Sequence, residues 1–319
     1  MYVNVLSRIR TIVRNLSRNA PFLFMLTPGI LLLLVFNYLP MAGILIAFKN
    51  YKFYGKNAID NFITSKWIGF KNFDFFINTP DAFTITRNTI LYNISFIVLG
   101  VFMAVIFATA INEIKKRTLA KLYQSVLLLP YFLSWIVVGY LVLAFLNSDY
   151  GIVNKFLNLI GVQGVSWYSA PNAWPPIIIF LNLWKNIGYR TVIFIAAIAS
   201  IDVELYEAAK TDGASRWQQI LKITIPSLVP LIIILVILDL GRIFNADFGL
   251  FYQATSQMGG GFLQPTVGVI DTYVYNALIN NGDVGMASAA GLYQAVVGFV
   301  TILGANFAIR RINKDYALF

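Results

Sequence analysis

Residues 204–226 read ELYEAAKTDGASRWQQILKITIP, and this polar stretch lies between two long apolar segments of the chain. Residues Glu204 to Lys210 are mostly helix formers, so they predict a short helix. Gly213 provides a break where the chain can turn before a second helical stretch. Pro226 suits the first turn of the apolar helix that follows. The sequence therefore predicts a short polar helix, a turn and a long apolar helix.

The short predicted helix carries small and charged side chains together. Ala208 and Ala209 would let another surface approach the helix closely. Charged side chains surround this small patch at Glu207, Lys210, Asp212 and Arg216. Two interpretations follow from composition alone, a docking helix and an ordinary amphipathic loop at a membrane surface.

The whole chain is as apolar as the segments beside this stretch. Of its 319 residues, 58% are hydrophobic, 15% aromatic and 12% charged, which is too apolar for a soluble domain. The chain has no cysteine and no histidine, so thiolate or imidazole metal sites and mechanisms with a histidine base are excluded. The formal charge of +10 comes mainly from basic residues at the ends of apolar segments. It therefore indicates membrane topology and not nucleic-acid binding.

We expect an all-α membrane protein with about six spans, because each apolar stretch can cross about 30 Å of hydrocarbon as a helix. The spans are predicted at residues 21–48, 88–112, 122–147, 174–200, 226–246 and 284–309. Charged residues interrupt two of them, so a strict hydropathy threshold would reject 174–200 and 226–246. Residues 21–310 would form one transmembrane domain containing the polar loop 201–225. Residues 1–20 and 311–319 would be cytoplasmic ends.

Basic residues near the span ends predict the orientation. They occur at Arg8, Arg10, Arg14, Arg18, Lys115, Lys116, Arg117, Lys121, Arg310, Arg311 and Lys314. Because cytoplasmic segments carry an excess of Lys and Arg, we expect both termini and loop 201–225 in the cytoplasm of a multi-pass cell-membrane protein. The first apolar run is too long for a cleaved signal peptide, so the first span is retained.

Ionisable residues inside a span usually face the bundle interior. Lys185 and Asp239 both fall near mid-depth of their spans, and Arg242 lies one turn after Asp239. Polar residues also recur at three- and four-residue intervals on the fourth span, which puts them on one face. The candidate substrate-pathway residues are Asn182, Lys185, Asn186, Tyr189, Asp239, Arg242 and, on the sixth span, Tyr293.

A structural role for these charges stays open. Lys185 with Asp239, or Asp239 with Arg242, would form an ion pair that fixes helix register. Lys185, Arg190 and Arg242 give three cations for the one carboxylate of Asp239, and this excess of positive charge would suit an acidic substrate. Arg190 would otherwise belong to a gate or to a partner interface.

Loop 201–225 resembles the EAA loop of binding-protein-dependent ABC importer permeases. The resemblance rests on Glu207-Ala208-Ala209, on Gly213 four residues later and on Ile-x-x-Pro at residues 223–226. It extends to Tyr38-Leu39-Pro40-Met41-Ala42-Gly43-Ile44, Ala47-Phe48-Lys49, Asp271-Thr272-Tyr273-Val274-Tyr275 and Ala289-Ala290-Gly291-Leu292-Tyr293-Gln294. These segments are similar to the complex-carbohydrate branch of type I importers, which is related to maltose and alginate permeases.

The resemblance implies a fold, a function and partners. It implies a type I permease fold whose EAA loop forms a coupling helix in a groove of an ATPase subunit. Coupling residues would be Glu204, Glu207, Ala208, Ala209, Lys210, Asp212, Gly213, Ala214 and Arg216. The implied partners are a second permease, two nucleotide-binding ATPase subunits, an extracytoplasmic binding protein, an oligosaccharide and membrane lipid. The pathway would work by alternating access, and its excess of positive charge would suit an acidic oligosaccharide such as a uronate-containing fragment.

An ATP site is not expected in this chain. No Gly-x-x-x-x-Gly-Lys-Ser/Thr sequence occurs, and Gly259-Gly260-Gly261 lacks the phosphate-binding lysine. We therefore expect a non-catalytic subunit with no cofactor, whose partner ATPase binds ATP and Mg²⁺.

Two other functions are alternatives to the importer. A stand-alone secondary transporter could use Asp239, Lys185 and Arg242 as an ion relay, but it leaves the EAA-like loop unexplained. A membrane-embedded hydrolase or transferase needs an acid and a base at one depth, whereas Asp239 is the one carboxylate clearly inside a predicted span.

Overall fold

The computed structural model describes residues 19–52, 57–255, 260–312, 314 and 317. The predicted basic cluster from Arg8 to Arg18 therefore lies outside the described residues. The described chain divides into two compact units. The first unit runs to Phe73 and includes Val284–Ala289, and the second contains Asp74–Asp283 and the chain from Ala290 onward.

The first unit combines one long apolar helix with a small folded segment. The elements in chain order are α2 (Ala20–Leu33), η1 (Leu34–Tyr38), η2 (Leu39–Phe48), β1 (Lys49–Asn50), α3 (Ala58–Thr64), β2 (Lys66–Trp67) and η3 (Gly69–Phe73). Strands β1 and β2 pair antiparallel, with Lys49 opposite Trp67. The Lys49 ammonium is buried and donates to the Phe62 carbonyl at 2.6 Å. The small segment thus begins directly where the apolar helix ends.

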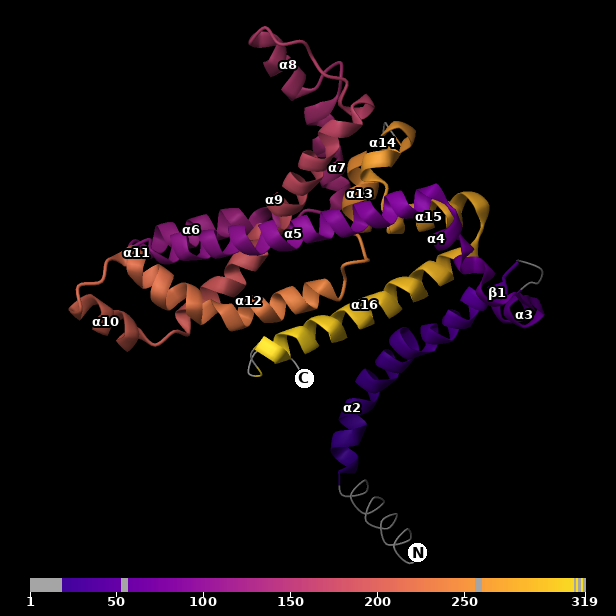
Figure 1. The fold of residues 1–319 in the computed structure, drawn as a ribbon, viewed down its shortest axis with the longest axis horizontal. Helices are drawn as coiled ribbons and strands as arrows, with labels where there is room; N and C mark the ends of the chain where they lie inside the picture. The colour runs from indigo at the N-terminus through magenta and orange to yellow at the C-terminus, as the bar shows by residue number, and fades with distance from the viewer. Residues whose placement is uncertain (1–18, 53–56, 256–259, 313, 315–316, 318–319) are drawn as a thin grey trace, which may run out of the picture. The chain divides into compact units, whose positions relative to one another are not determined.

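The second unit is a bundle of helices (Figure 1). Its long helices are α5 (Pro80–Asn112), α9 (Trp174–Ala199), α12 (Ile225–Leu240) and α16 (Val284–Ile312), of which α16 begins in the first unit. The shorter helices are α4 (Asp74–Asn78), α6 (Arg117–Leu128), η4 (Leu129–Phe132), α7 (Trp135–Leu146), α8 (Ile152–Leu159), η5 (Trp167–Ser169), η6 (Pro171–Ala173), α10 (Val203–Thr211), α11 (Arg216–Gln219), η7 (Ile220–Thr224), α13 (Phe248–Thr255), α14 (Gly260–Val267) and α15 (Ile270–Asn281).

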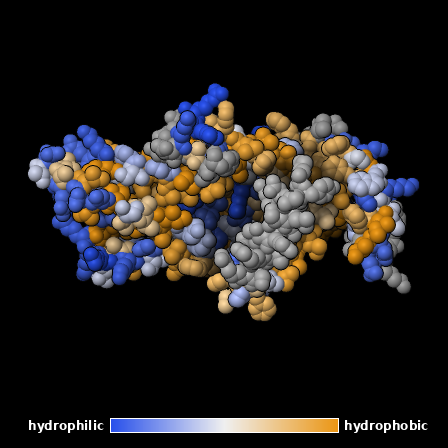
Figure 2. All heavy atoms as spheres, turned by 90° about the horizontal axis from the view of Figure 1, so that it is seen from below, coloured by the Kyte–Doolittle hydropathy of each residue, from blue (hydrophilic) through white to orange (hydrophobic). Residues whose placement is uncertain are grey.

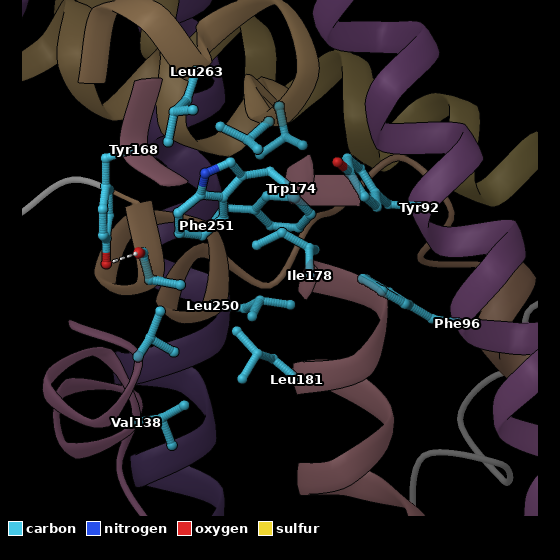
Figure 3. Close-up of a cluster of buried hydrophobic side chains, with 14 residues drawn as sticks. Tyr92, Phe96, Val138, Tyr168, Trp174, Ile178, Leu181, Leu250, Phe251 and Leu263 are labelled. Carbon is cyan, nitrogen blue, oxygen red and sulfur yellow. Dashed lines mark hydrogen bonds between the residues drawn. The ribbon is translucent and has the colours of Figure 1, made fainter. Parts of the chain in front are cut away.

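Two apolar clusters hold the second unit together. In the cluster of Figure 3, Trp174 and Ile178 of α9 pack with Val138 of α7 and Phe251 of α13, all almost fully buried. A second cluster lies between α5 and α9, where the small side chains of α5 meet larger ones. Its buried members are Val101, Ala104, Ala108, Phe194, Ile198 and Leu228. Helices α5 and α9 both contribute to the two clusters and are therefore the central pair of this unit.

The architecture is helical apart from the short strands β1 and β2, which confirms the predicted fold class, but the count of six spans is not confirmed. Four helices of the described chain are long and apolar enough to cross a membrane, Ala20–Phe48, Asp81–Asn112, Arg216–Leu240 and Val284–Arg311. The bent pair Arg117–Phe132 and Trp135–Leu146 would be a fifth. Helix α9 is 26 residues long but is not among them, because its polar residues lower its hydropathy.

Two predicted spans differ in the structure, since one is bent and the other has shifted bounds. The segment predicted at 122–147 bends by 96° between η4 and α7. Pro130 starts the break, and Leu133 and Ser134 are extended. In place of the span predicted at 226–246, the structure has one helix from Arg216 to Leu240, because α11 and η7 continue into α12. An apolar sequence predicts a helix but does not show where tertiary contacts replace helical hydrogen bonds.

Gly188 fixes the distance between α9 and α6. A Cβ atom at this position would lie 2.0 Å from the Leu127 carbonyl oxygen and 2.7 Å from the Leu128 Cα. Real side chains do not approach backbone so closely, so only glycine allows this packing.

Gly188→Ala should therefore push α9 away from α6 and destabilise the protein by about 1–3 kcal/mol or more, the usual range for overpacking. The measurement is the thermal unfolding of the purified protein. Gly291→Ala is the matched control, because a Cβ at Gly291 meets no atom within 4 Å. Equal melting temperatures for the two variants would contradict this account of the packing.

Candidate functional site: a polar cavity and an exposed loop

The predicted short helix of loop 201–225 is present as α10, Val203–Thr211. Asp202 caps it, since the carboxylate accepts a hydrogen bond from the Glu204 N–H at 3.0 Å. Gly213 has a φ of +79°, so the chain turns at the predicted glycine. Ser215 and Gln218 then form a capping box that starts α11. Local sequence signals therefore determine both helices of the loop.

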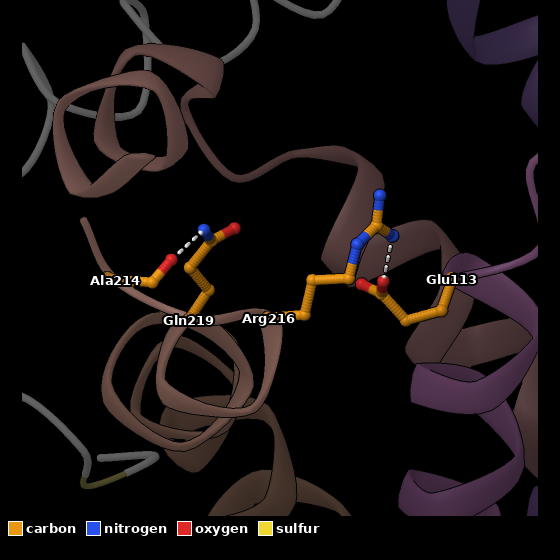
Figure 4. A network of polar contacts seen from close by, with 4 residues as sticks. All are labelled: Glu113, Ala214, Arg216 and Gln219. Carbon is orange, nitrogen blue, oxygen red and sulfur yellow. Dashed lines mark hydrogen bonds and ion pairs between the residues drawn. The ribbon is translucent and has the colours of Figure 1, made fainter. Parts of the chain in front are cut away.

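Side chains tie this loop to the long helices. The Tyr206 and Thr224 hydroxyls lie 2.8 Å apart, which joins α10 to the helix that continues as α12. Arg216 forms an ion pair with Glu113, with Nη1 and Oε2 2.6 Å apart, and Glu113 directly follows α5 (Figure 4). Gln219 donates to the Ala214 carbonyl at 2.9 Å in the same region. The loop is thus joined through side chains to both α5 and α12.

The loop also presents a mixed surface to the outside. The predicted coupling residues that are exposed are Glu204, Glu207, Ala208, Lys210, Asp212, Gly213 and Arg216, whereas Ala209 and Ala214 are half-buried. Apolar side chains of the same loop are exposed too, at Val203, Leu205 and Trp217. Figure 2 shows hydrophilic residues gathered at the end of the second unit where α10 and α11 lie, beside a broad apolar surface. A pocket of about 300 Å³ between α10 and α11 includes Ala209, Asp212, Gly213 and Ala214.

A polar cavity of about 500 Å³ lies between α5, α9 and the end of α12. Its lining consists of Asn93, Phe96, Ile97, Tyr131, Asn182, Asn186, Tyr189, Arg190, Ile193, Leu235, Asp239, Arg242, Asn245, Ala246 and Asp247. Five of the seven predicted pathway residues are among them, namely Asn182, Asn186, Tyr189, Asp239 and Arg242. The three-and-four spacing on α9 therefore identified one wall of a real cavity.

Lys185 and Tyr293 do not line this cavity. Lys185 is buried and donates hydrogen bonds to backbone carbonyls between α6 and α7. Tyr293 stacks on Phe76, with ring centroids 4.6 Å apart, and meets the edge of Phe244 at 5.9 Å. Both side chains support neighbouring structure in this conformation.

The ion pair of the cavity differs from both pairs considered in the sequence. Arg190 pairs with Asp239, with Nη1 and Oδ2 2.8 Å apart and both side chains partly exposed. Lys185 does not reach Asp239, and Arg242 makes no ion pair with any described residue. Arg190 and Asp239 come from different helices, so spacing along one helix could not reveal their contact.

The expected excess of positive charge is also corrected. Lys185 lies outside the cavity and Asp247 lines it, so two cations stand against two carboxylates. Asp247 accepts hydrogen bonds from the Trp135 indole at 2.9 Å and from the Leu250 N–H at 3.3 Å. Asp239 is neutralised by Arg190. Arg242 is thus the cavity cation, and Asp247 the cavity carboxylate, without an ionic partner among the described residues.

Residues 241–247 connect α12 to α13 without forming a regular helix, and side chains satisfy their backbone. Asn93 of α5 donates to the carbonyls of Ile243 and Asn245, at 2.9 and 3.1 Å. Gln294 of α16 donates to the Phe244 carbonyl at 2.7 Å. These amides let a non-helical segment carry the cavity residues Arg242, Asn245 and Asp247.

Asp271 of α15 completes this support. Its carboxylate accepts from the Ala246 N–H at 2.7 Å and from Gln294 at 3.2 Å. Burial raises the pKa of Asp271 above its usual value, although both hydrogen bonds favour the charged form. Asn93, Asn245 and Asp247 are site residues that the sequence does not predict, because nothing in their spacing indicates that they meet α9.

The comparisons with known proteins add to this geometry. A family model described as "Binding-protein-dependent transport system inner membrane component" matches residues 96–314. The chain belongs to this family. This match confirms the resemblance seen in the sequence. The chain is a multi-pass permease subunit, the inner-membrane component of such transport systems.

Relatives and solved structures match almost the whole permease. Protein LplB of Bacillus subtilis (strain 168) is 35% identical over 94% of this chain and 92% of its own length. The polygalacturonan/rhamnogalacturonan transport system permease protein YteP of the same organism is 29% identical, over 97% and 93%. A chain in the crystal structure of a bacterial ABC transporter involved in the import of the acidic polysaccharide alginate matches with a TM-score of 0.84 and 33% identity, over 95% of this chain and 99% of that one. The type I permease fold is therefore confirmed.

The Arg190–Asp239 pair should show strong coupling in a double-mutant cycle. Arg190→Gln and Asp239→Asn should each lower the stability of the permease, because each leaves a half-buried charge without its partner. The loss of unfolding free energy in the double variant should be smaller than the sum of the two single losses, by about 0.5–3 kcal/mol. Thermal unfolding measures all three variants. The exposed Glu113–Arg216 pair, treated in the same way, should couple by less than about 1 kcal/mol, and a larger value there than at Arg190–Asp239 would contradict the assignment.

Proposed function

We propose that this permease subunit forms, with a second permease, the membrane pathway for an acidic oligosaccharide. The observation that carries the proposal is Arg242, a guanidinium without an ionic partner among the described residues, on the wall of a polar cavity. A guanidinium binds a carboxylate through two parallel hydrogen bonds. The amides of Asn182 and Asn186 and the ring of Tyr189 on the same wall provide groups that suit sugar hydroxyls and sugar faces.

The relatives support this substrate class. Two solved structures with more than 30% identity are of alginate transporters, and one of them holds a periplasmic protein with a bound alginate pentasaccharide. YteP is named for polygalacturonan and rhamnogalacturonan, which are also acidic. Another relative, AraP of Halalkalibacterium halodurans, is named for arabinooligosaccharides and is 29% identical. We therefore expect uronate-containing oligosaccharides to be preferred over neutral ones.

The energy would come from two ATPase partners that bind ATP and Mg²⁺ and dock on loop 201–225. Their docking surface would be the exposed face of α10 with Ala208, the adjacent charges and the exposed Leu205 and Trp217. An exposed apolar surface rimmed by charged residues is typical of a protein interface. Loop 201–225 and both termini would then be cytoplasmic, and an extracytoplasmic binding protein would deliver the sugar on the other side.

Movement of α10 would reach the cavity through covalent and side-chain links. Helix α9 leads into α10 through Ser200, Ile201 and Asp202, and α10 contacts the start of α12 through Tyr206 and Thr224. Both α9 and α12 line the cavity. Closure of the ATPase subunits would thus change the cavity walls and open the pathway alternately to each side.

Arg242→Gln should lower the uptake of a uronate oligosaccharide about tenfold or more, since a hydrogen bond to a charged group contributes about 1.5–3 kcal/mol. Uptake of a neutral sugar, if the transporter accepts one, should change much less. The measurement is uptake and ATP hydrolysis by the complete transporter in liposomes with its binding protein. Arg310→Gln, which removes an exposed cation near the end of α16, is the control. Equal loss for acidic and neutral sugars would contradict the charge preference.

Glu207→Arg should abolish ATP-driven uptake while membrane insertion stays normal, because it reverses a charge on the proposed docking face. Asp149→Arg, the same reversal on the exposed loop between α7 and α8, should leave ATPase assembly intact. Uptake that continues after ATP depletion and stops when the membrane potential collapses would favour a secondary transporter and overturn the proposal.

A further inference from the structure

Lys185 lies in the middle of α9, and its side chain is engaged away from the cavity. The residue is 8% exposed. Its ammonium donates to the Tyr131 carbonyl at 2.9 Å, to the Leu133 carbonyl at a shorter distance and to the Pro130 carbonyl at 3.5 Å. All three acceptors belong to the corner Leu129–Ser134, where the chain bends between α6 and α7.

The corner needs donors because its short helix η4 ends at Phe132. The Leu133 N–H donates to the Pro130 carbonyl, but the chain is extended at Leu133 and Ser134, so the Tyr131 and Leu133 carbonyls have no backbone donor among the described residues. A carbonyl without a partner at membrane depth costs several kcal/mol. An ammonium carries three donors and no acceptor, which matches a group of three carbonyls better than an amide does.

The same side chain lies close to two aromatic rings of the corner. Lys185 Nζ is 5.7 Å from the centroid of Tyr131 and 5.2 Å from that of Trp135, within the range of cation–π contacts. Tyr131 stacks on Tyr189 of α9, with centroids 4.9 Å apart and planes 10° apart. Trp135 donates to Asp247. Tyr131, Tyr189 and Asp247 all line the cavity, so the corner shapes its wall.

A second contact joins the corner region to α9. At Gly188, one turn after Lys185, the backbones of α9 and α6 meet so closely that no Cβ fits beside Leu127. Together, the glycine contact and the ammonium hold α6, the corner and α9 in one arrangement.

We propose that Lys185 is a positioning residue that clamps the corner Leu129–Ser134 to α9, so that the cavity wall follows α9 when α10 moves. This proposal rests on the proposed function for its role in transport, but the clamp itself is a property of the permease. The ammonium acts through Tyr131 and Trp135 and does not contact the sugar. Lys185→Met should therefore free the corner from α9 without removing a group from the cavity.

Distance measurements test the clamp directly. The chain has no cysteine, so Phe132→Cys and Ala199→Cys can carry two nitroxide labels on exposed positions of the corner and of the α9 end. The α9 axis from Lys185 to Ala199 is about 21 Å long, which suits pulsed electron paramagnetic resonance. The sample is the assembled transporter with cysteine-free partners, without nucleotide and with ATP trapped.

With Lys185 present, we expect one narrow distance distribution that is the same in both nucleotide states. Lys185→Met should broaden it or make it change with ATP, and Lys185→Gln, which keeps two donors, should give an intermediate width. Lys155→Met on the exposed surface of α8 is the control and should match the unmodified permease. If Lys185→Met fails to assemble, Lys185→Gln supplies the comparison, and a distribution as narrow as the control in the assembled variants would overturn the clamp.

Transport gives a second readout. Lys185→Met should lower the sugar taken up per ATP hydrolysed by about tenfold, because loss of a link between two sites reduces their coupling. The concentration of sugar-loaded binding protein that gives half-maximal uptake should stay close to that of the unmodified transporter, since no sugar contact is removed. A raised half-saturation with unchanged uptake per ATP would instead make Lys185 a substrate ligand and overturn the proposal. If the unmodified transporter takes up no sugar, the proposed function fails while the distance measurement still tests the clamp.

Discussion

The rest of this permease depends on one constraint, that backbone polar groups at membrane depth must find partners within the protein. Most of the chain meets it with helical hydrogen bonds. Two segments of the second unit do not, the corner Leu129–Ser134 and residues 241–247. Side chains from other helices supply the missing partners there. Lys185 serves the corner, and Asn93, Gln294 and Asp271 serve the second segment.

These two interruptions are also what makes a cavity possible. An uninterrupted bundle would pack its apolar side chains against one another, as α5 and α9 do around Ala104 and Phe194. Where the helices break, polar side chains instead face a space of about 500 Å³. A membrane protein tolerates irregular backbone at this depth where it is buried in protein or lines a water-filled cavity. The cost of the breaks and the polarity of the cavity therefore have the same structural origin.

Helix α9 connects this cavity to the surface loop. Its side chains Asn182, Asn186 and Tyr189 line the cavity, and Lys185 bonds the corner Leu129–Ser134. The helix continues within a few residues into α10. The contact between Tyr206 and Thr224 links α10 to the helix that continues as α12. The ion pair between Arg190 and Asp239 then joins α9 to α12 at the cavity itself. A displacement of the loop would reach both walls through these few contacts.

The sequence by itself determined the features that depend on neighbouring residues. Apolar length gave the helical membrane class, Asp202, Gly213 and Ser215 gave the limits of α10 and α11, and the three-and-four spacing gave one polar wall of α9. The tertiary structure decided what depends on contacts between distant segments. It paired Asp239 with Arg190, it brought Asn93 and Asp247 into the cavity, and it turned Lys185 toward the carbonyls of the corner. A side chain at membrane depth takes the partner that the packed helices bring within hydrogen-bonding distance. The spacing of residues along the sequence does not show which distant residues the packing brings together.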